Sequence, residues 1–477
     1  MTRELADVLR KHGFDLYPRS LRTIGGGIRL FVAVHAGRKA VGTLQTRKTL
    51  ELSSPVLPNE LEMLSGATVS LHTLTWENYE KLRTVTCISP TRRDKRASFG
   101  TGDRLGLVSA AHLDALGSYP VFPVIAQQSP RELGRTGRDF KNVLLDAVMG
   151  VLESGYTGTY GADADHIKDE QHLKAAAEAG YSMYTLDISD WTQDASSAAR
   201  RLSSLSRSII SDCAEMKLST RSENYAISEQ ELLTSARMYE KALERVGDFN
   251  SLLQRAVGDF DLEISIDEGD RQTSVEDHLF VAEYLHRSGI DFTSLAPKFP
   301  GQFQKGVDYV GDVEALARCL WTHAALCKEI GGYRLSLHSG SDKFSIYPIF
   351  AEITEGRFHV KTSGTSWLQA VKVIASVNVP LFRELYTLCL QNLDESKKAY
   401  DVSITKQDFP AELPKVDLPV FLTRPDMRQL FHISYGVLLD NKRHQIFETL
   451  HRRESEHYSL VRDHIGKHLS LLFEVEA

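Results

Sequence analysis

The eight residues Gly161-Ala162-Asp163-Ala164-Asp165-His166-Ile167-Lys168 combine two carboxylates, an imidazole and an ammonium group within one short stretch. An apolar helical segment precedes them and another follows, which predicts a strand that ends over Tyr160 to Asp163 and turns into a helix. Alternate strand residues share a face, so Asp163 and Asp165 would lie together and the turn could bring His166 to the same point. That would place an acid–base group beside a metal ligand. The alternative is a solvated turn in which Asp165 caps the next helix.

The alternation of strand-length apolar runs and helical stretches continues from Phe99 onward and favours a parallel sheet. Helical stretches end at glycines, such as Gly155 after residues 142–152 and Gly180 after residues 169–179. Eight strands, each followed by a helix, predict an α/β protein with a (β/α)8 TIM-type barrel, in which chemistry lies at the carboxyl ends of the strands. The predicted strands are Arg104 to Val108, Val121 to Ala126, Thr159 to Asp163, Met183 to Ile188, Asp261 to Ile266, Phe292 to Ala296, Arg334 to His338 and Phe358 to Thr362.

The sequence predicts three parts. Residues 1–96 form a small α+β appendage, with a hairpin whose strands, residues 28–34 and 40–46, are joined at His35 to Arg38. Residues 97–440 form the barrel, with a mostly helical insertion at 192–257 that we expect over the barrel mouth. Residues 441–477 form a helical extension. The spacing of its histidines predicts solvent-facing positions rather than ligands: His444, His451, His457, His464 and His468.

Composition excludes several classes of protein. The 477 residues are 42% hydrophobic and 25% charged, which is typical of a globular chain. The net charge of −7 gives no general basic field for nucleic acid or an anionic membrane, so the basic run Arg92 to Arg96 is predicted to be a solvated loop face. Five cysteines without a CxxC pair indicate a reducing cytoplasm. No apolar run reaches the length of a membrane span.

Polar residues gather at the predicted strand ends. Strand three delivers Asp165 and His166, and strand seven ends in His338. In strand five, Glu263, Ser265 and Asp267 alternate onto one face, and an inward polar row is costly unless its members are paired or bind a ligand. Glu263 is therefore a candidate for acid–base work or metal binding, with Glu268 at the strand tip as the competing choice. In strand eight, His359 and Lys361 share a face.

Basic residues near the same ends suit an acidic substrate. Arg131 and Arg135 follow strand two, and an arginine fork is the preferred partner of a carboxylate. Lys298 follows strand six and Lys361 lies in strand eight. Helix capping and surface ion pairing are the alternative roles for the arginines. The imidazole and carboxylate ligands suit zinc, manganese, iron, cobalt or nickel, and such a divalent cation would act as a Lewis acid.

Seven runs in order resemble the successive motifs of the tagaturonate/fructuronate epimerases of bacterial hexuronate catabolism, from about Leu16 to the C-terminus. They are SFGTGDRLGL, AQQSPRELGRTGR, GADADHIK, EISIDE, SLAPKFPGQFQKGVDYVGD, RLSLHSGSDKFSIYP and HVKTSGTSWLQA. The resemblance implies an isomerase for a small sugar acid, with a divalent metal and two acid–base residues. Asp165-His166 and His338-Ser339-Gly340-Ser341 also resemble, more distantly, class II aldolases. That pattern implies that Asp165 moves the proton and that His166 and His338 bind metal. Strand six lacks the histidine that class II aldolases have, so His359 and Glu263 are both open as third ligand.

The two sugar acids differ at the carbon β to the ketone, whose hydrogen that carbonyl does not acidify. One route is retro-aldol cleavage, in which a base takes the hydroxyl proton of the inverting carbon and the adjacent bond breaks and reforms. The other is proton transfer between Asp165 and Glu263 or Glu268. A class II-type aldolase would instead release two smaller carbonyl compounds, and a sugar-acid-binding protein would show no turnover. The sequence sets neither the sugar-acid preference nor the oligomeric state.

Overall fold

The computed structural model describes residues 2–47, 49–194, 201–221, 224–269, 271–398, 400, 402–410, 412–413 and 418–474. The predicted insertion at 192–257 includes residues 195–200 and 222–223, which lie outside this set. The predicted extension at 441–477 likewise includes residues 475–477, outside the described part. None of the described helices is long and apolar enough to cross a membrane.

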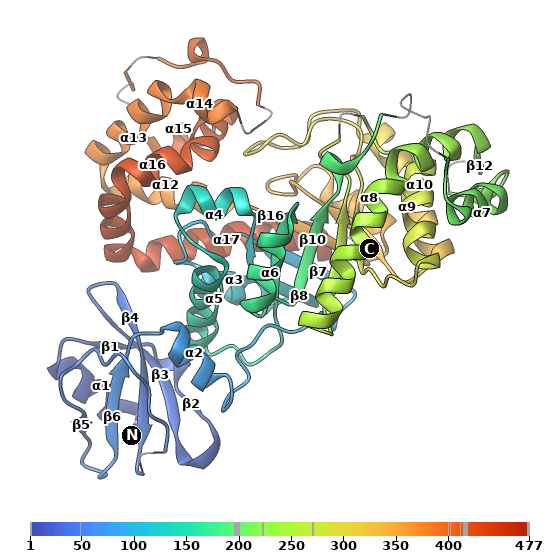
Figure 1. The fold of residues 1–477 in the computed structure, drawn as a ribbon. Helices are drawn as coiled ribbons and strands as arrows, with labels where there is room; N and C mark the ends of the chain where they lie inside the picture. The colour runs from blue at the N-terminus through green and yellow to red at the C-terminus, as the bar shows by residue number, and fades with distance from the viewer. Residues whose placement is uncertain are drawn as a thin grey trace.

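An antiparallel sheet of six strands precedes the barrel, at the lower left of Figure 1. Its strands follow the order β1-β3-β4-β6-β5, with β2 paired to β3. The predicted hairpin is confirmed: Ala36 and Gly37 both have positive φ, 47° and 78°, as a two-residue turn between twisted strands requires. The elements are α1 (Thr2–Lys11), β1 (Asp15–Leu16), β2 (Arg22–Thr23), β3 (Arg29–His35), β4 (Arg38–Gln45), β5 (Leu61–Glu62), β6 (Thr68–His72) and α2 (Trp76–Leu82).

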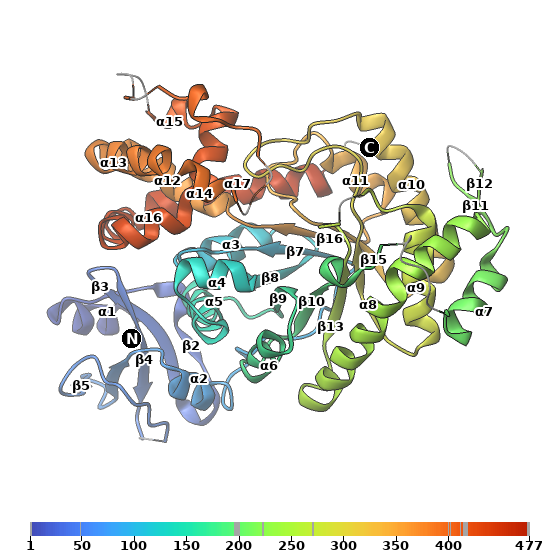
Figure 2. The ribbon, with the colours of Figure 1, turned by 45° about the horizontal axis from the view of Figure 1, so that its top comes forward.

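Eight parallel strands close into a barrel in the order β10-β13-β14-β15-β16-β7-β8-β9, which confirms the predicted fold class (Figure 2). Their carboxyl ends therefore meet around one mouth. The strands are β7 (Ala97–Thr101), β8 (Val121–Gln128), β9 (Gly161–Ile167), β10 (Met183–Asp187), β13 (Asp261–Ser265), β14 (Ser294–Ala296), β15 (Arg334–Leu337) and β16 (Phe358–Thr362).

Helices between the strands surround the barrel. Ser274 and Asp277 form a full capping box at the start of α9, and the Ser228 hydroxyl accepts the Glu231 N–H at the start of α8. The surrounding helices are α3 (Ser109–Leu116), α4 (Pro130–Thr136), α5 (Phe140–Ser154), α6 (Glu170–Glu178), α8 (Glu229–Ala256), α9 (Val275–Arg287), α10 (Val313–Ile330) and α11 (Tyr347–Ile353).

Most of the predicted insertion is α8, which belongs to this ring, and the described part before α8 lies on the outside of the ring. Its helix α7 (Ser204–Cys213) packs on α8 and α9, and the hairpin of β11 (Lys217–Ser219) and β12 (Asn224–Ala226) lies near α10, at the right of Figure 1. In the described residues, therefore, α7 and the hairpin cover the outer face of these helices.

After β16 the chain leaves the barrel and later returns to it. Five helices form a cluster with its own apolar core, drawn in orange and red in Figure 1. They are α12 (Thr365–Val377), α13 (Val379–Gln391), α14 (Leu393–Lys397), α15 (Leu418–Phe421) and α16 (Pro425–Arg452). The last helix, α17 (Glu454–Phe473), packs between α3 and α11 and adds Val461, Ile465, Leu469 and Leu472 to the barrel core. It thus occupies the place of the eighth barrel helix.

This position of α17 corrects the prediction for the C-terminal histidines. His457 and His468 are buried, and the Nε2 atom of His464 lies 2.5 Å from Asp342 Oδ1. The solvent-facing assignment is wrong for these three because they line the face of α17 that packs on the barrel. His444 is exposed, as predicted.

The prediction of the first strand at Arg104 to Val108 is wrong. The strand is β7, residues Ala97–Thr101, and the apolar residues after it form a turn. The Asp103 carboxylate accepts the backbone N–H groups of Leu105, Gly106 and Val108, and Gly106 has a φ of 71°. A short aspartate that gathers backbone donors in this way competes with strand pairing.

The third strand is longer than predicted. Instead of ending at Asp163, β9 continues to Ile167 and contains the whole acidic stretch. The pairing register with β10 shifts between Tyr184 and Leu186, and His166 has a φ of 50° at this irregularity. A bulge with a residue in this conformation redirects side chains, so Asp165 and His166 can both turn towards the barrel mouth.

Candidate active site

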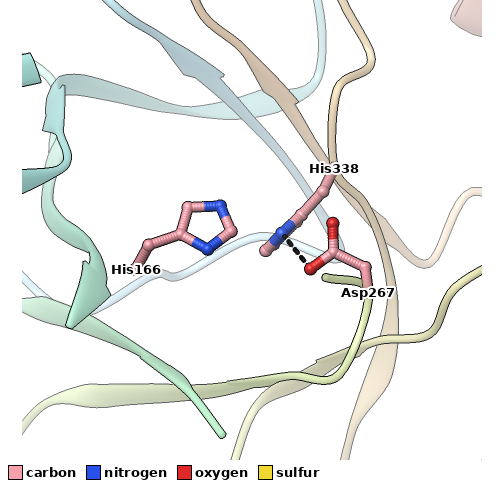
Figure 3. Close-up of side chains that lie close together, drawn as sticks. All are labelled: His166, Asp267 and His338. Atoms are coloured by element: carbon pink, nitrogen blue, oxygen red, sulfur yellow. Dashed lines mark ion pairs between the residues drawn. The ribbon is translucent and has the colours of Figure 1, made fainter. Parts of the chain in front are cut away.

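Three side chains from different strands meet at the carboxyl end of the barrel. His166 comes from β9, Asp267 follows β13 and His338 follows β15. One potential ligand atom of each lies within 4.8 Å of the others. The two imidazole rings have their centroids 5.0 Å apart and stand nearly at right angles, at 73°. Figure 3 shows the two rings side by side, with the Asp267 carboxylate against His338.

His338 is held from behind by a buried carboxylate. Its Nε2 atom lies 2.6 Å from Glu263 Oε1, and its Nδ1 atom lies 3.2 Å from Asp267 Oδ1. Within the described residues, Nδ1 is a buried nitrogen without a well-formed hydrogen bond. When Nε2–H donates to Glu263, Nδ1 carries a lone pair directed at the same space as Asp267. A metal-binding histidine has this arrangement, with its second nitrogen donating to a carboxylate.

His166 has a similar setting. Its Nδ1 atom lies 3.3 Å from Oδ2 of Asp187, the fully buried last residue of β10. Its Nε2 atom lies 3.7 Å from Asp165 Oδ1. His166, Asp187 and Glu268 form a second group whose ligand atoms lie within 4.8 Å of one another. The two groups share His166, so a bound ion could take ligands from both.

Lys361 lies below the histidines inside the barrel. Its Nζ atom is 2.7 Å from Asp163 Oδ2, 2.8 Å from Asp165 Oδ1 and 2.9 Å from Glu263 Oε1. Burial alone would raise the pKa values of Asp165 and Glu263, but Lys361 and the histidines hold both below their usual range. Asp163 differs: burial and the two neighbouring carboxylates raise its pKa to about 6. The single positive charge of Lys361 thus offsets only part of the negative charge of these three carboxylates.

The whole site attracts positive charge. Six carboxylates surround the two histidines, against two lysine ammonium groups, those of Lys168 and Lys361. The six are Asp163, Asp165, Asp187, Glu263, Asp267 and Glu268. Burial alone would lower the pKa of His338, but Asp267 and Glu263 raise it to about 10. The same field favours a divalent cation.

A cavity of about 270 Å³ lies over the histidines. Its floor contains His166, Asp267, Glu268 and His338, and its roof is the loop after β14 together with Tyr400. The remaining lining residues are Arg131, Pro297, Lys298, Phe299, Gly301, Gln302, Phe303, Gln304, Lys305 and Ser339. No described residue of 192–257 lines it, so the expectation that this insertion covers the mouth is wrong. The loop after β14 takes that place.

Three cations line this cavity. The Lys305 Nζ atom donates to Ser339 Oγ at 2.8 Å, and burial together with Arg131 lowers its pKa. Arg131 lies 5.2 Å from the centre of the Tyr400 ring. Lys298 donates to the Gly269 carbonyl at 2.5 Å, which directs its ammonium group to the loop after β13. Arg131 and Lys305 are thus the cations best placed to contact an anionic ligand.

The other predicted site residues occupy different places. Glu268 lies on the cavity and pairs with Lys168 at 3.1 Å, whereas Glu263 and Lys361 lie beneath it in the barrel. Arg135 is not among the lining residues and lies 5.3 Å from the Tyr400 ring centre. His359 lies deeper, with Nδ1 2.6 Å from Ser98 Oγ. Burial lowers the pKa of His359 to about 3, so it is neutral there.

Three residues of the site had no predicted role. Asp267 was identifiable, because it lies on the inward face with Glu263 and Ser265. Asp187 also leaves a signal, as the one acid at the end of an otherwise uncharged strand. Lys305 leaves none, since it reaches the cavity only through the path of the irregular loop from Pro297 to Asp312.

A third group, Asp342, His464 and His468, lies outside this site and also has ligand atoms within 4.8 Å of one another. Its groups are already paired, however. Asp342 Oδ2 accepts from Arg428 at 2.6 Å, while His468 accepts the Asp342 N–H at 3.0 Å and donates to the His464 carbonyl at 2.8 Å. The cluster therefore fixes the loop after His338 to α16 and α17 and has no free nitrogen on His468.

Comparisons with known proteins identify relatives over nearly the whole chain. The model of the tagaturonate epimerase family, UxaE, matches residues 17–472. A protein of Thermotoga maritima described as tagaturonate/fructuronate epimerase is 42% identical over 409 residues, which are 83% of this chain and 85% of that one. The native crystal structure of fructuronate-tagaturonate epimerase UxaE from Cohnella laeviribosi aligns with a TM-score of 0.89 and 33% identity over 99% of both chains. A glycerol complex of the Cohnella protein aligns with a TM-score of 0.86 and 33% identity over 98% of this chain and 99% of that one.

Proposed function

Because the chain belongs to the tagaturonate epimerase family, we propose that it interconverts tagaturonate and fructuronate in the cavity above His166 and His338, with a divalent metal cation. The observation that carries the proposal is the convergence of two histidines and Asp267, from three strands, on one point beneath a cavity with a cationic wall. Cavities of this size and composition suit a small sugar acid.

The donor set fits a divalent cation. His338 Nδ1, His166 Nε2 and a carboxylate oxygen of Asp267 would hold it, and Glu263 and Asp187 would orient the two imidazoles through their other nitrogens. When bound, such a cation supplies Lewis-acid polarisation of a substrate oxygen. The residue types do not select one metal, because imidazole and carboxylate serve zinc, manganese, iron, cobalt and nickel alike.

The acid–base groups favour a route with one base. Proton transfer at the inverting carbon needs two groups on opposite sides of it. Glu263 is fully buried and bonded to Lys361, Ser294 and His338, and the remaining pair, Asp165 and Glu268, both lie beside His166. Asp165, or Glu268 on the cavity wall, can accept the substrate hydroxyl proton and return it, which is all that retro-aldol cleavage and re-addition require. We therefore propose the retro-aldol route, with Asp165 as the base because its carboxylate lies 3.7 Å from His166 Nε2, beside the point where the metal would be held.

The substrate carboxylate is assigned to Arg131 and Lys305. Both line the cavity, and burial and Arg131 lower the pKa of Lys305, an effect that a substrate carboxylate between the two cations would offset. Holding the acid end of the sugar there keeps the rest of the molecule over His166 and His338. It would also keep the aldehyde in place between bond cleavage and re-addition, because its carboxylate would stay bound to these two cations.

The central test is conversion of tagaturonate to fructuronate by the purified protein in deuterated water. We expect an isomer of unchanged carbon skeleton, without deuterium at the inverted carbon, because that hydrogen never leaves in the retro-aldol route. Chelation should remove the activity and a divalent cation should restore it. Nuclear magnetic resonance of the product and metal analysis before and after chelation measure these outcomes.

Each part of the proposal can fail by itself. Deuterium at the inverted carbon would exclude the retro-aldol route while leaving the epimerase function intact. Net release of two smaller carbonyl compounds would favour an aldolase. Full activity after thorough chelation would remove the metal from the proposal.

Lys305→Met should raise the KM for both sugar acids about 10- to 100-fold, with a smaller effect on kcat. The reason is loss of a charge-assisted hydrogen bond to the carboxylate, which contributes about 1.5–3 kcal/mol. Steady-state kinetics measure the change. Lys298→Met is the matched control, since its ammonium group donates to the Gly269 carbonyl. Equal KM changes in the two variants would contradict the assignment of the carboxylate to Lys305.

A further inference from the structure

A second cavity, of about 420 Å³, opens at the opposite, amino-terminal end of the barrel, and we call it the arginine cavity. Its lining residues are Arg93, Asp94, Lys95, Arg96, Arg334 and Arg357. Three of the arginines belong to consecutive strands of the barrel: Arg334 begins β15, Arg357 directly precedes β16 and Arg96 directly precedes β7. The basic run Arg92 to Arg96, predicted as a solvated loop face, therefore joins arginines from distant parts of the chain.

Arg334 is a buried cation that forms no ion pair with a carboxylate of the described residues, although Asp261 and Glu263 attract it from a distance. Only 3% of its surface is exposed, and its two terminal nitrogens donate to the Arg96 carbonyl at 2.9 Å and to Ser98 Oγ at 2.7 Å. Its Nε atom has no hydrogen-bond partner among the described residues, and none of their carboxylates pairs with it. Burial and the neighbouring Arg93 lower its pKa to about 9. A buried charge is costly unless an opposite charge approaches it.

Nearby carboxylates are already engaged elsewhere. Asp261 accepts from the Arg92 side chain at 3.3 Å and from the Arg93 N–H at 2.8 Å, and Asp94 accepts from Thr159 at 2.7 Å. Glu355 pairs with Lys328. The side chains of Arg96 and Arg357 are exposed and form no close hydrogen bond or ion pair with a described residue, although the charge of Glu355 attracts both. The cavity thus has a surplus of guanidinium groups.

We propose that the arginine cavity binds the phosphate group of a small molecule. Guanidinium forks match a phosphate dianion bidentately, and several of them around one concave site favour phosphate over a single carboxylate. An adjoining cavity of about 330 Å³ shares Arg96, Arg334 and Arg357. Apolar side chains such as Ala324, Leu335 and Ile353 line part of its remaining wall, and Lys328, Thr354 and Glu355 line the rest. The adjoining cavity suits the organic part of a phosphate ester.

Thermal unfolding of the full chain at constant ionic strength tests the proposal. Saturating inorganic phosphate in place of chloride should raise the Tm by about 2 °C or more, since a ligand that binds only the folded state stabilises it. The variant Arg96→Gln/Arg357→Gln should lose this rise and keep its epimerase activity, because both residues lie at the far end of the barrel. This pair leaves Arg334 and its contacts in place.

A second arm distinguishes the sources of the phosphate. A larger rise with AMP than with inorganic phosphate would assign the cavity to a phosphate ester, and an equal rise would assign it to free phosphate. The Lys305→Met variant should retain the rise, which separates this site from the catalytic cavity. No rise in the native chain, or an equal rise in Arg96→Gln/Arg357→Gln, would overturn the proposal.

Discussion

Replacing His338 with glutamine should abolish binding of the divalent cation and lower kcat/KM by about 10³-fold or more. The substitution removes the imidazole and with it Nδ1, which lies towards Asp267 and His166. Without this ligand the site would lose the divalent cation that acts as the Lewis acid. A loss of this size corresponds to about 4 kcal/mol of transition-state stabilisation. Metal content by mass spectrometry and steady-state kinetics measure the two effects.

His359→Gln is the matched control for this variant. Both histidines lie inside the barrel and are almost fully buried, but His359 bonds to Ser98 near the start of β7 and is absent from both cation-binding groups of the site. We expect His359→Gln to keep its metal. Loss of metal in His359→Gln and its retention in His338→Gln would reverse the ligand assignment, and it would return His359 to the place that the sequence left open for it.

The barrel was predictable because strand-length segments alternate with helical stretches that end at glycines, and most of these strands are apolar; β9, with its two aspartates, departs from this pattern. The exception, Arg104 to Val108, shows the limit of the pattern. Its apolar residues pack inward from a turn, and only the contacts of Asp103 with three backbone N–H groups separate that turn from a strand. Hydrophobicity alone contains no information about those contacts.

The site was partly predictable for a related reason. His166 and His338 end strands, so barrel geometry alone brings them to one mouth. The orienting roles of Glu263 and Asp187, by contrast, depend on which atoms face each other across the barrel. The position of Lys305 depends on the path of a loop whose sequence has no periodicity. The position of α17 depends on the return of the chain to the ring after five other helices. Long-range packing decides such positions, and a single sequence does not encode it in any local pattern.

Replacing Lys361 with methionine should lower the free energy of unfolding by about 3–5 kcal/mol, the cost of leaving buried carboxylates without their cation. Asp163, Asp165 and Glu263 all lie within 2.9 Å of its ammonium group, and none of the three is more than 7% exposed. Chemical denaturation measures the loss. Lys174→Met, which removes an exposed ammonium group 2.6 Å from Glu170 on α6, should show no measurable change.

The dependence of this loss on pH follows from the charges. Without Lys361, burial would raise the folded-state pKa values of the three carboxyl groups relative to the native chain, most of all that of Asp163, because the histidines still lower those of Asp165 and Glu263. Groups of that kind stabilise the fold at low pH, and this stabilisation disappears as pH rises through the folded-state pKa. The deficit of Lys361→Met relative to the native chain should therefore be largest near neutral pH and above, and shrink as pH falls. A deficit that is constant with pH would mean that lost packing, rather than unpaired charge, destabilises the variant. Lys361 would then fill space in the barrel without holding its carboxylates in place.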